Sequence, residues 1–126
     1  MRYMLLMHYA EATDETVGAE AMEAGRVAMN AYAATLAKAG VLVGAEVLQP
    51  RANTTTLRTL GGALQIQDGP FADTKEQLGG VFVIDVSNLD SAIDWARQVP
   101  ALQWGGQVEI RPGAVYTVDG AWVANE

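Results

Sequence analysis

The alternation of apolar and polar positions along the chain predicts a mixture of strands and helices. Residues 2–9 and 81–86 carry apolar side chains at both odd and even positions, which indicates β-strands whose two faces both need cover. Between about residues 19 and 38, apolar side chains recur at the spacing of an amphipathic helix, and Gly40 ends that pattern. The chain is therefore expected to combine a sheet with at least one long helix.

Shorter elements fill the rest of the pattern. A second helix is expected between the cap Ser87–Asn88 and the breaker Val99–Pro100. Its inner stripe is expected to consist of Leu89, Ile93 and Ala96. The remaining strands and hairpins are expected at residues 41–48, at 54–60 and 63–67 with Gly61-Gly62 as their turn, at 107–111, and at 115–123 around Asp119-Gly120.

The order of these elements predicts the fold class. Strand, helix, strand, hairpin, strand, helix, strand is a ferredoxin-like α+β arrangement, βαβ-β-hairpin-βαβ. Two helices can cover only one face of such a sheet, whereas residues 2–9 and 81–86 are apolar on both faces. We therefore predict a symmetric homodimer in which two sheets pack face to face.

Composition narrows the class of protein. The 126 residues, 50% of them hydrophobic, suit one domain that spans residues 1–126. A net charge of −7 argues against duplex nucleic acid as a partner, because such binding depends on basic contacts to phosphate. With no cysteine and a single histidine, the usual zinc ligand sets cannot be assembled within one chain, so no metal is expected.

Two further signals bear on cofactors and membranes. The glycine pairs at 61–62, 79–80 and 105–106 lack the spacing of a dinucleotide or Walker motif, so no cofactor is expected. The apolar opening Tyr3–Met7 is too short for a signal-peptide core or a membrane span. We expect a cytoplasmic protein whose partner is a small molecule or another protein.

Residues 68–80, called here the motif loop, combine turn residues, a possible helix cap, an aromatic residue and four charged residues within a short segment. The run Asp68-Gly69-Pro70-Phe71 predicts a turn, because glycine before proline is driven to extended angles and proline presets the next position. Phe71 is expected to be buried as the plug that holds this turn against the core. On that expectation, Phe71→Ala would cost about 3–5 kcal/mol of folding free energy.

The second half of the motif loop has the form of a helix start. Asp73 followed three residues later by Glu76 is the pattern of an N-cap with a capping box, and Gly79 supplies a stop. A helical turn over about residues 74–78 is expected, with Lys75 close to its free N–H groups and able to hold an anionic or carbonyl oxygen. The alternative is that Asp68 and Asp73 only satisfy backbone donors while Lys75 and Glu76 face water.

Two other positions are candidates for chemistry. His8 ends the first strand beside Tyr9, and histidine is the side-chain type that ordinarily changes charge near neutral pH, so His8 is a candidate base. The alternative is a packed or interface histidine. Arg111 either pairs with Glu109 on the open face of the sheet or holds a substrate carboxylate in bidentate fashion.

Several runs of residues resemble the landmarks of a known family. The sequence Asp68-Gly69-Pro70-Phe71 resembles the signature of the YCII-related superfamily, in the branch named after its Asp-Gly-Pro-Phe motif. The other matching runs are Met1–Leu6, Gly44–Pro50, Thr74–Gly80 and Glu109–Pro112. The resemblance implies the dimeric α+β barrel fold and a pocket near the sheet and the motif loop.

One departure from the family pattern limits what can be carried over. Better-known YCII-like members are associated with a histidine–aspartate pair whose histidine lies on the first helix. The long helix here has no histidine, and Met29 or a neighbour stands at about that place. The histidine–aspartate chemistry is therefore not assigned to this chain.

Two functional classes follow. The first is a cofactor-independent lyase or isomerase that moves a proton on a small anionic or oxygenated compound. Asp68 or His8 would be its base, and the residues that would contact the substrate are Lys75, Arg111, Tyr9 and Phe71. The alternative is a non-catalytic binding or regulatory accessory protein, which the frequent encoding of family members near alternative sigma factors favours.

Overall fold

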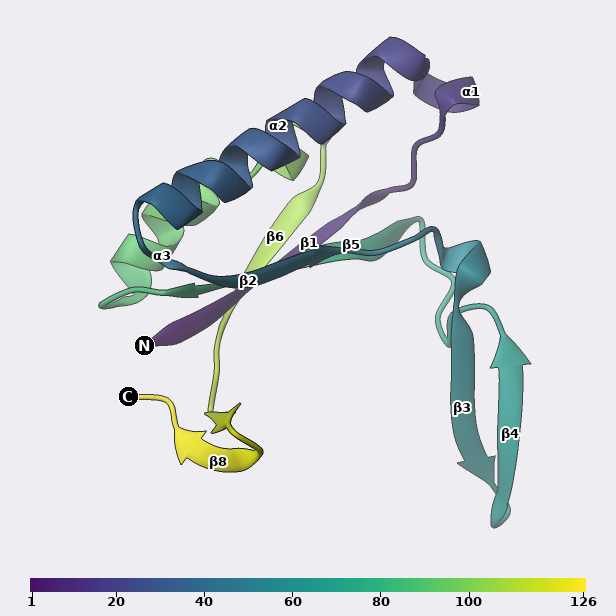
Figure 1. The fold of residues 1–126 in the computed structure, drawn as a ribbon. Helices are drawn as coiled ribbons and strands as arrows, with labels where there is room; N and C mark the ends of the chain where they lie inside the picture. The colour runs from purple at the N-terminus through teal and green to yellow at the C-terminus, as the bar shows by residue number, and fades with distance from the viewer.

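The computed structural model describes residues 1–126 and contains one main sheet with helices on one of its faces (Figure 1). The main sheet has four strands in the order β2-β5-β1-β6. Its strands are β1 (Arg2–Ala10), β2 (Leu42–Val47), β5 (Glu76–Asp85) and β6 (Gln107–Pro112). The helices are α1 (Asp14–Val17), α2 (Ala19–Lys38) and α3 (Leu89–Ala96), with short 3-10 turns η1 (Arg51–Asn53) and η2 (Pro100–Trp104).

The strand pairing makes two split βαβ units. Both β1 and β2 run antiparallel to β5, so β1 and β2 are parallel to each other with β5 between them. In the same way β5 and β6 both run antiparallel to β1, which lies between them. The helix that follows β1 and the helix that follows β5 cross over the same face. This mostly antiparallel α+β arrangement confirms the predicted ferredoxin-like class.

Two hairpins stand outside the main sheet and lie below it in Figure 1, on the side away from the helices. The first consists of β3 (Thr55–Leu60) and β4 (Ala63–Asp68), and the second of β7 (Val115–Val118) and β8 (Ala121–Ala124). Gly61 and Gly62 have φ of 57° and 81°, as a two-residue hairpin turn of the I′ kind requires. Both hairpins and their turns are where the sequence predicts them.

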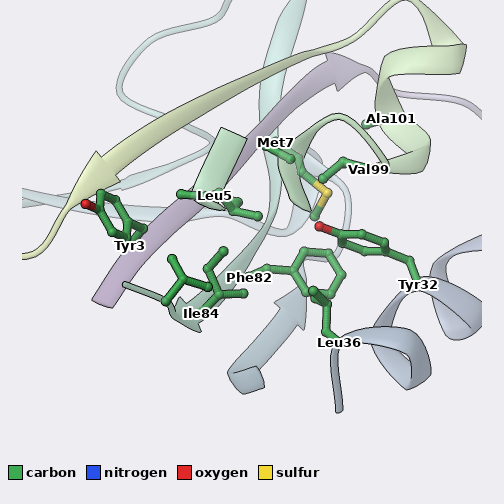
Figure 2. Packing of buried hydrophobic residues seen from close by; sticks show 12 residues of the cluster. Tyr3, Leu5, Met7, Tyr32, Leu36, Phe82, Ile84, Val99 and Ala101 are labelled. Atoms are coloured by element: carbon green, nitrogen blue, oxygen red, sulfur yellow. The ribbon is translucent and has the colours of Figure 1, made fainter. Parts of the chain in front are cut away.

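The core lies between the sheet and the helices and is built from one face of β1 and β5 (Figure 2). The register pairs Tyr3 with Ile84 and Leu5 with Phe82, and all four side chains are buried. The α2 helix contributes Tyr32 and Leu36 to the same cluster. The aromatic rings of Tyr32 and Phe82 meet edge to face with centroids 5.0 Å apart.

Tyr32 also joins the two helices. Its hydroxyl donates to the Trp95 carbonyl oxygen at 2.9 Å, and burial raises the pKa of Tyr32 to about 12. The α3 helix buries Ala92 and Ala96, whereas Leu89 is 49% exposed. The expected inner stripe of α3 is therefore wrong at Leu89, because the buried side of this short helix is formed by Ala92 and Ala96.

The opposite face of the sheet carries the alternate residues of β1 and β5, those that do not enter the core. Met4 lies opposite Val83 and Leu6 opposite Val81, so four apolar side chains form a continuous patch. Met4 is 39% exposed and the other three are partly buried. We call this surface the open face, since no helix covers it (Figure 1).

The predicted helical turn over residues 74–78 is wrong. Glu76 begins β5, and pairing with β1 continues through Ala10 opposite Glu76 and Tyr9 opposite Gln77. Strand pairing along β1 satisfies backbone groups that a single isolated helical turn would leave without partners. Asp73 is accordingly not a helix cap; its carboxylate meets Arg51 instead.

The expectation that Phe71 plugs the core is also wrong, because the side chain is 81% exposed. The turn is held by its backbone and by a threonine. The Gly69 N–H donates to the Thr54 carbonyl oxygen at 2.8 Å, and the Thr56 hydroxyl donates to the Gly69 carbonyl oxygen at 2.7 Å. These contacts define the turn without any help from the aromatic ring.

The two phenylalanines of the chain provide a matched test of this core. Phe82 is 2% exposed, so Phe82→Ala should lower the free energy of unfolding by about 3–5 kcal/mol. Phe71→Ala should change it by less than about 0.5 kcal/mol, as at other exposed positions. Urea unfolding followed by circular dichroism measures both. Equal losses for the two variants would contradict this placement of the core.

Candidate functional site

A pocket of about 570 Å³ lies where the end of β1 meets the motif loop. The side chains that line it are all polar, namely His8, Thr74, Lys75, Glu76, Gln107 and Glu109. A register shift between Met7 and His8 in the pairing with β5 marks this end of β1. His8 consequently lies opposite Leu78 on one side and Gln107 on the other. Such bulges redirect side chains and are common beside functional sites.

His8 and Glu109 form the closest polar contact in the pocket. The Nε2 atom of His8 lies 2.6 Å from Oε1 of Glu109, and the side chains are 29% and 58% exposed. The contact runs diagonally between neighbouring strands, because Glu109 lies directly opposite Leu6. Nε2 itself is buried and has no aligned hydrogen-bond partner, so this carboxylate is the polar group that meets it.

Lys75 supplies the cation of the pocket. It forms none of the ion pairs in the structure, although Glu76 and Glu109 line the same pocket. Its ammonium group is therefore available to a bound oxygen atom. Together the lining offers one cation, two carboxylates and one imidazole, a set suited to proton transfer next to a negatively charged oxygen.

Arg51 anchors the motif loop to the rest of the protein. Its Nη1 atom lies 3.1 Å from Oδ1 of Asp73 and donates to the Thr74 carbonyl oxygen at 2.7 Å. Its Nε atom lies 3.3 Å from Oε1 of Glu11, and its backbone N–H donates to the same carboxylate at 3.2 Å. One side chain thus joins the segment after β1, the η1 turn and the motif loop.

The side chain of Gln77 forms hydrogen bonds to the backbone within the motif loop. Its side-chain amide donates to the carbonyl oxygens of Ala72 and Thr74, at 3.2 and 2.9 Å. The Thr74 hydroxyl in turn donates to the Glu76 carbonyl oxygen at 2.6 Å. The backbone on either side of Lys75 is therefore fixed, which restricts the direction of the Lys75 side chain.

Of the residues proposed from sequence, the pocket brings together His8 and Lys75. Asp68 does not line the pocket, and its carboxylate makes no hydrogen bond or ion pair. Phe71 lines a separate depression of about 360 Å³ with Thr56, Leu57 and Arg58. Arg111 lies opposite Met4 and forms no ion pair with Glu109, whose carboxylate meets His8. The suggested pairing of Glu109 with Arg111 is therefore wrong.

Tyr9 lies on the other face of the sheet from His8. Its ring packs edge to face against Trp104 with centroids 5.6 Å apart, and it covers Gly79 so closely that a Cβ there would overlap the ring. Burial raises the pKa of the Tyr9 hydroxyl, and the Glu11 carboxylate raises it further. Gly79 is thus a packing site for an aromatic ring and not the helix stop that the sequence suggested.

The structure adds five residues that sequence reasoning did not place in the site: Glu109 as the partner of His8, Gln107, Thr74, Glu76 and Arg51. Glu109 and Gln107 alternate along β6, so both were identifiable as same-face residues. Their position beside His8 depends on the register between β1 and β6. Arg51 carries no local signal, because its partners lie 22 and 40 residues away, at Asp73 and Glu11.

No group of three or more His, Cys, Asp or Glu side chains is placed to hold a metal ion. No helix is long and apolar enough to cross a membrane.

The ferredoxin-like sheet and its motif loop correspond to a known family. The YCII-related domain matches residues 1–113. The chain is also 36% identical over 117 residues to the uncharacterized protein R00369 of Rhizobium meliloti (strain 1021), and the match covers 92% of this chain and 94% of that protein. The chain therefore belongs to the YCII-related domain family, as the resemblance suggested.

Arg51→Met should loosen the motif loop while leaving the fold intact. Its contacts are partly exposed, so we expect the free energy of unfolding to fall by roughly 1 kcal/mol. Amide hydrogen exchange at residues 72–75 should become faster, since the contacts to Asp73 and Thr74 are lost. Arg97→Met, which removes only an exposed contact of 3.8 Å to Asp94, is the control. Unchanged exchange at residues 72–75 would show that Arg51 does not hold the loop.

Proposed function

We propose that this chain binds a small anionic or oxygenated metabolite in the pocket between β1, β6 and the motif loop, and moves a proton on it. The contact of 2.6 Å between His8 Nε2 and Glu109 Oε1 carries the proposal. Lys75 shares the pocket and has no ion-pair partner. We further assign the chain to the Asp-Gly-Pro-Phe branch of its family, on the run Asp68–Phe71.

The proposed chemistry uses only side chains of this protein. The imidazole of His8 takes a proton from a carbon atom next to a carbonyl group, and the electron pair of that C–H bond moves toward the carbonyl oxygen. Lys75 stabilises the negative charge that develops on this oxygen, and Glu109 stabilises the imidazolium that forms. Return of the proton to another carbon completes an isomerisation, and departure of a leaving group completes a lyase reaction.

Asp68 has no part in this scheme, because its carboxylate does not line the pocket. Arg111 lies elsewhere on the open face, so a substrate would have to extend along β6 to reach it. His8 is therefore the base that we propose, with Lys75 as the group that holds the anion.

We also propose that the protein is a homodimer joined through the open face. The patch formed by Met4, Leu6, Val81 and Val83 supports this assembly, because apolar patches of this kind on a soluble protein mark interaction surfaces. His8 is two residues after Leu6 on β1, and Glu109 lies opposite Leu6 on β6, so both side chains are on the open face. The pocket therefore lies at one end of that face.

A second candidate function is binding without catalysis. The pocket has no hydrophobic lining, whereas catalytic and ligand sites are usually enclosed and mostly apolar. A broad polar pocket also suits a protein that senses a metabolite or binds a charged segment of another protein. The experiments below separate the two functions, because only the catalytic one requires an ionisation of His8.

Lys75→Ala should remove ligand binding while leaving the fold unchanged. A panel of small carboxylates and inorganic phosphate is tested by thermal shift, where a ligand at 100 times its dissociation constant adds about 2.7 kcal/mol to stability. Lys75→Ala should abolish the shift with a melting temperature close to that of the parent, because Lys75 makes no structural ion pair. Lys38→Ala, at the other lysine of the chain, should keep the shift. A shift that survives Lys75→Ala would contradict the proposed anion site.

The catalytic version requires a specific pH dependence. For a substrate found in such a screen, the pH profile of kcat/KM should contain one ionisation that disappears in His8→Gln. Glu109→Gln should lower kcat/KM, since it removes the negative charge that stabilises the imidazolium formed during proton transfer. A profile that is identical in the parent and in His8→Gln would leave only the binding function.

A further inference from the structure

The hairpin of β3 and β4, residues 55–68, is called here the arm. Its two strands pair only with each other and not with the main sheet. It projects from the end of the sheet on the side away from the helices (Figure 1). An isolated two-stranded hairpin is at best marginally stable in water, so an arm of this length is expected to lie against another surface.

The register of the arm separates an apolar side from a polar side. Leu57 lies opposite Ile66 and Thr59 opposite Leu64, and side chains directly opposite each other share a face. Leu57, Leu64 and Ile66 are 59%, 62% and 69% exposed. The other side carries Arg58 and Gln67, and Nη2 of Arg58 donates to Oε1 of Gln67 at 2.8 Å. On the polar side, Arg58 and Gln67 hydrogen-bond to each other within the arm. On the apolar side, the exposed side chains have no surface to pack against.

We propose that the apolar side of the arm packs against a second copy of this chain and clasps the dimer that the open faces form. The inference rests on the homodimer of the proposed function and adds the surface that holds it. In Figure 1 the arm and the C-terminal hairpin lie at the two ends of the open face. A copy seated on this face therefore lies next to the arm.

The free apolar area supports a contact that includes the arm. Interfaces of standard size bury roughly 800 Å² per partner, over half of it apolar. The open face contributes Met4, Leu6, Val81 and Val83, with Leu78 opposite His8 at one end; Met4 and Leu78 are the most exposed at 39% and 40%, so the sheet alone offers limited unburied area. Leu57, Leu64 and Ile66 are each more exposed than Met4 and supply much of the missing area.

Charge supports a second copy as the occupant. The chain carries a net charge of −7, so two copies repel each other wherever acidic surfaces meet. The open face, however, carries basic as well as acidic side chains, because the register places Arg2 and Arg111 there together with Glu46, Glu76, Asp85 and Glu109. A surface that carries charges of both signs can set a basic group of one copy against an acidic group of the other across a two-fold axis. The apolar side of the arm bears a single charge, at Asp68.

The arm offers a matched pair of substitutions. Leu57 and Leu60 lie on the same strand and are 59% and 57% exposed, but Leu60 is on the polar side, opposite Ala63. Leu57→Gln combined with Ile66→Gln removes the apolar side, and Leu60→Gln is the control. None of these side chains belongs to the buried core, so each variant is expected to fold. Circular dichroism and thermal melting confirm folding.

Sedimentation equilibrium over a range of concentrations gives the mass and the dimer dissociation constant of each variant. The parent should have twice the 13.4 kDa chain mass at low micromolar concentration. The double arm variant should raise the dissociation constant about 100-fold, as loss of two central interface side chains does, and Leu60→Gln should change it less than about threefold. Amide protons of residues 55–68 should exchange more slowly as the dimer forms.

The other outcomes contradict either the arm contact alone or the dimer as a whole. A parent dimer that the double arm variant leaves unchanged contradicts the arm contact, while the dimer through the open face stands. A parent that stays monomeric at 100 times that concentration contradicts both assemblies. The metabolite pocket is tested separately, because the thermal shift lost in Lys75→Ala does not depend on either outcome.

Discussion

The pairing of β1 between β5 and β6 is the constraint on which the rest of this structure depends. Its odd positions, such as Tyr3, Leu5 and Met7, face the helices and form the core. Its even positions face away from the helices, so the same strand builds the open face and carries His8 near its end. A shift of one residue would exchange these faces and bury the histidine in place of the core. One register thus fixes the core, the unpartnered surface and the candidate site together.

The site arises where that register is interrupted. At the irregularity between Met7 and His8, Gly79 of β5 has no partner on β1, and the site lies beside this point at the motif loop, which Arg51 and Gln77 hold in place. Gly80 is buried against the methyl group of Met7 and the Glu46 carbonyl oxygen, where any Cβ would overlap. Gly79 and Gly80 therefore allow close packing, while Thr74 and Lys75 line the pocket. Rigid supports of this kind suit a site that must hold a small ligand in one orientation.

Periodic elements could be predicted from sequence, whereas contacts between distant segments could not. The α2 helix and both hairpins follow from apolar spacing and glycine turns within a few residues. The motif loop was predicted wrongly because Asp73 and Glu76 have the local form of a capping box, but pairing of Glu76 with Ala10 extends the strand instead. The contact between His8 and Glu109 joins residues 101 apart along the chain, so it depends on a strand register that no local pattern specifies.

We propose that His8 and Lys75 belong to one anion-binding pocket, and the single histidine of the chain allows a direct test. The imidazole gives one set of nitrogen-15 and proton resonances, which can be followed by nuclear magnetic resonance during titration with malonate and inorganic phosphate. The account predicts that an anion which stabilises the protein shifts the His8 resonances along a saturating curve, with the same dissociation constant as the thermal shift. Stabilisation by an anion that leaves the His8 resonances unmoved would contradict it.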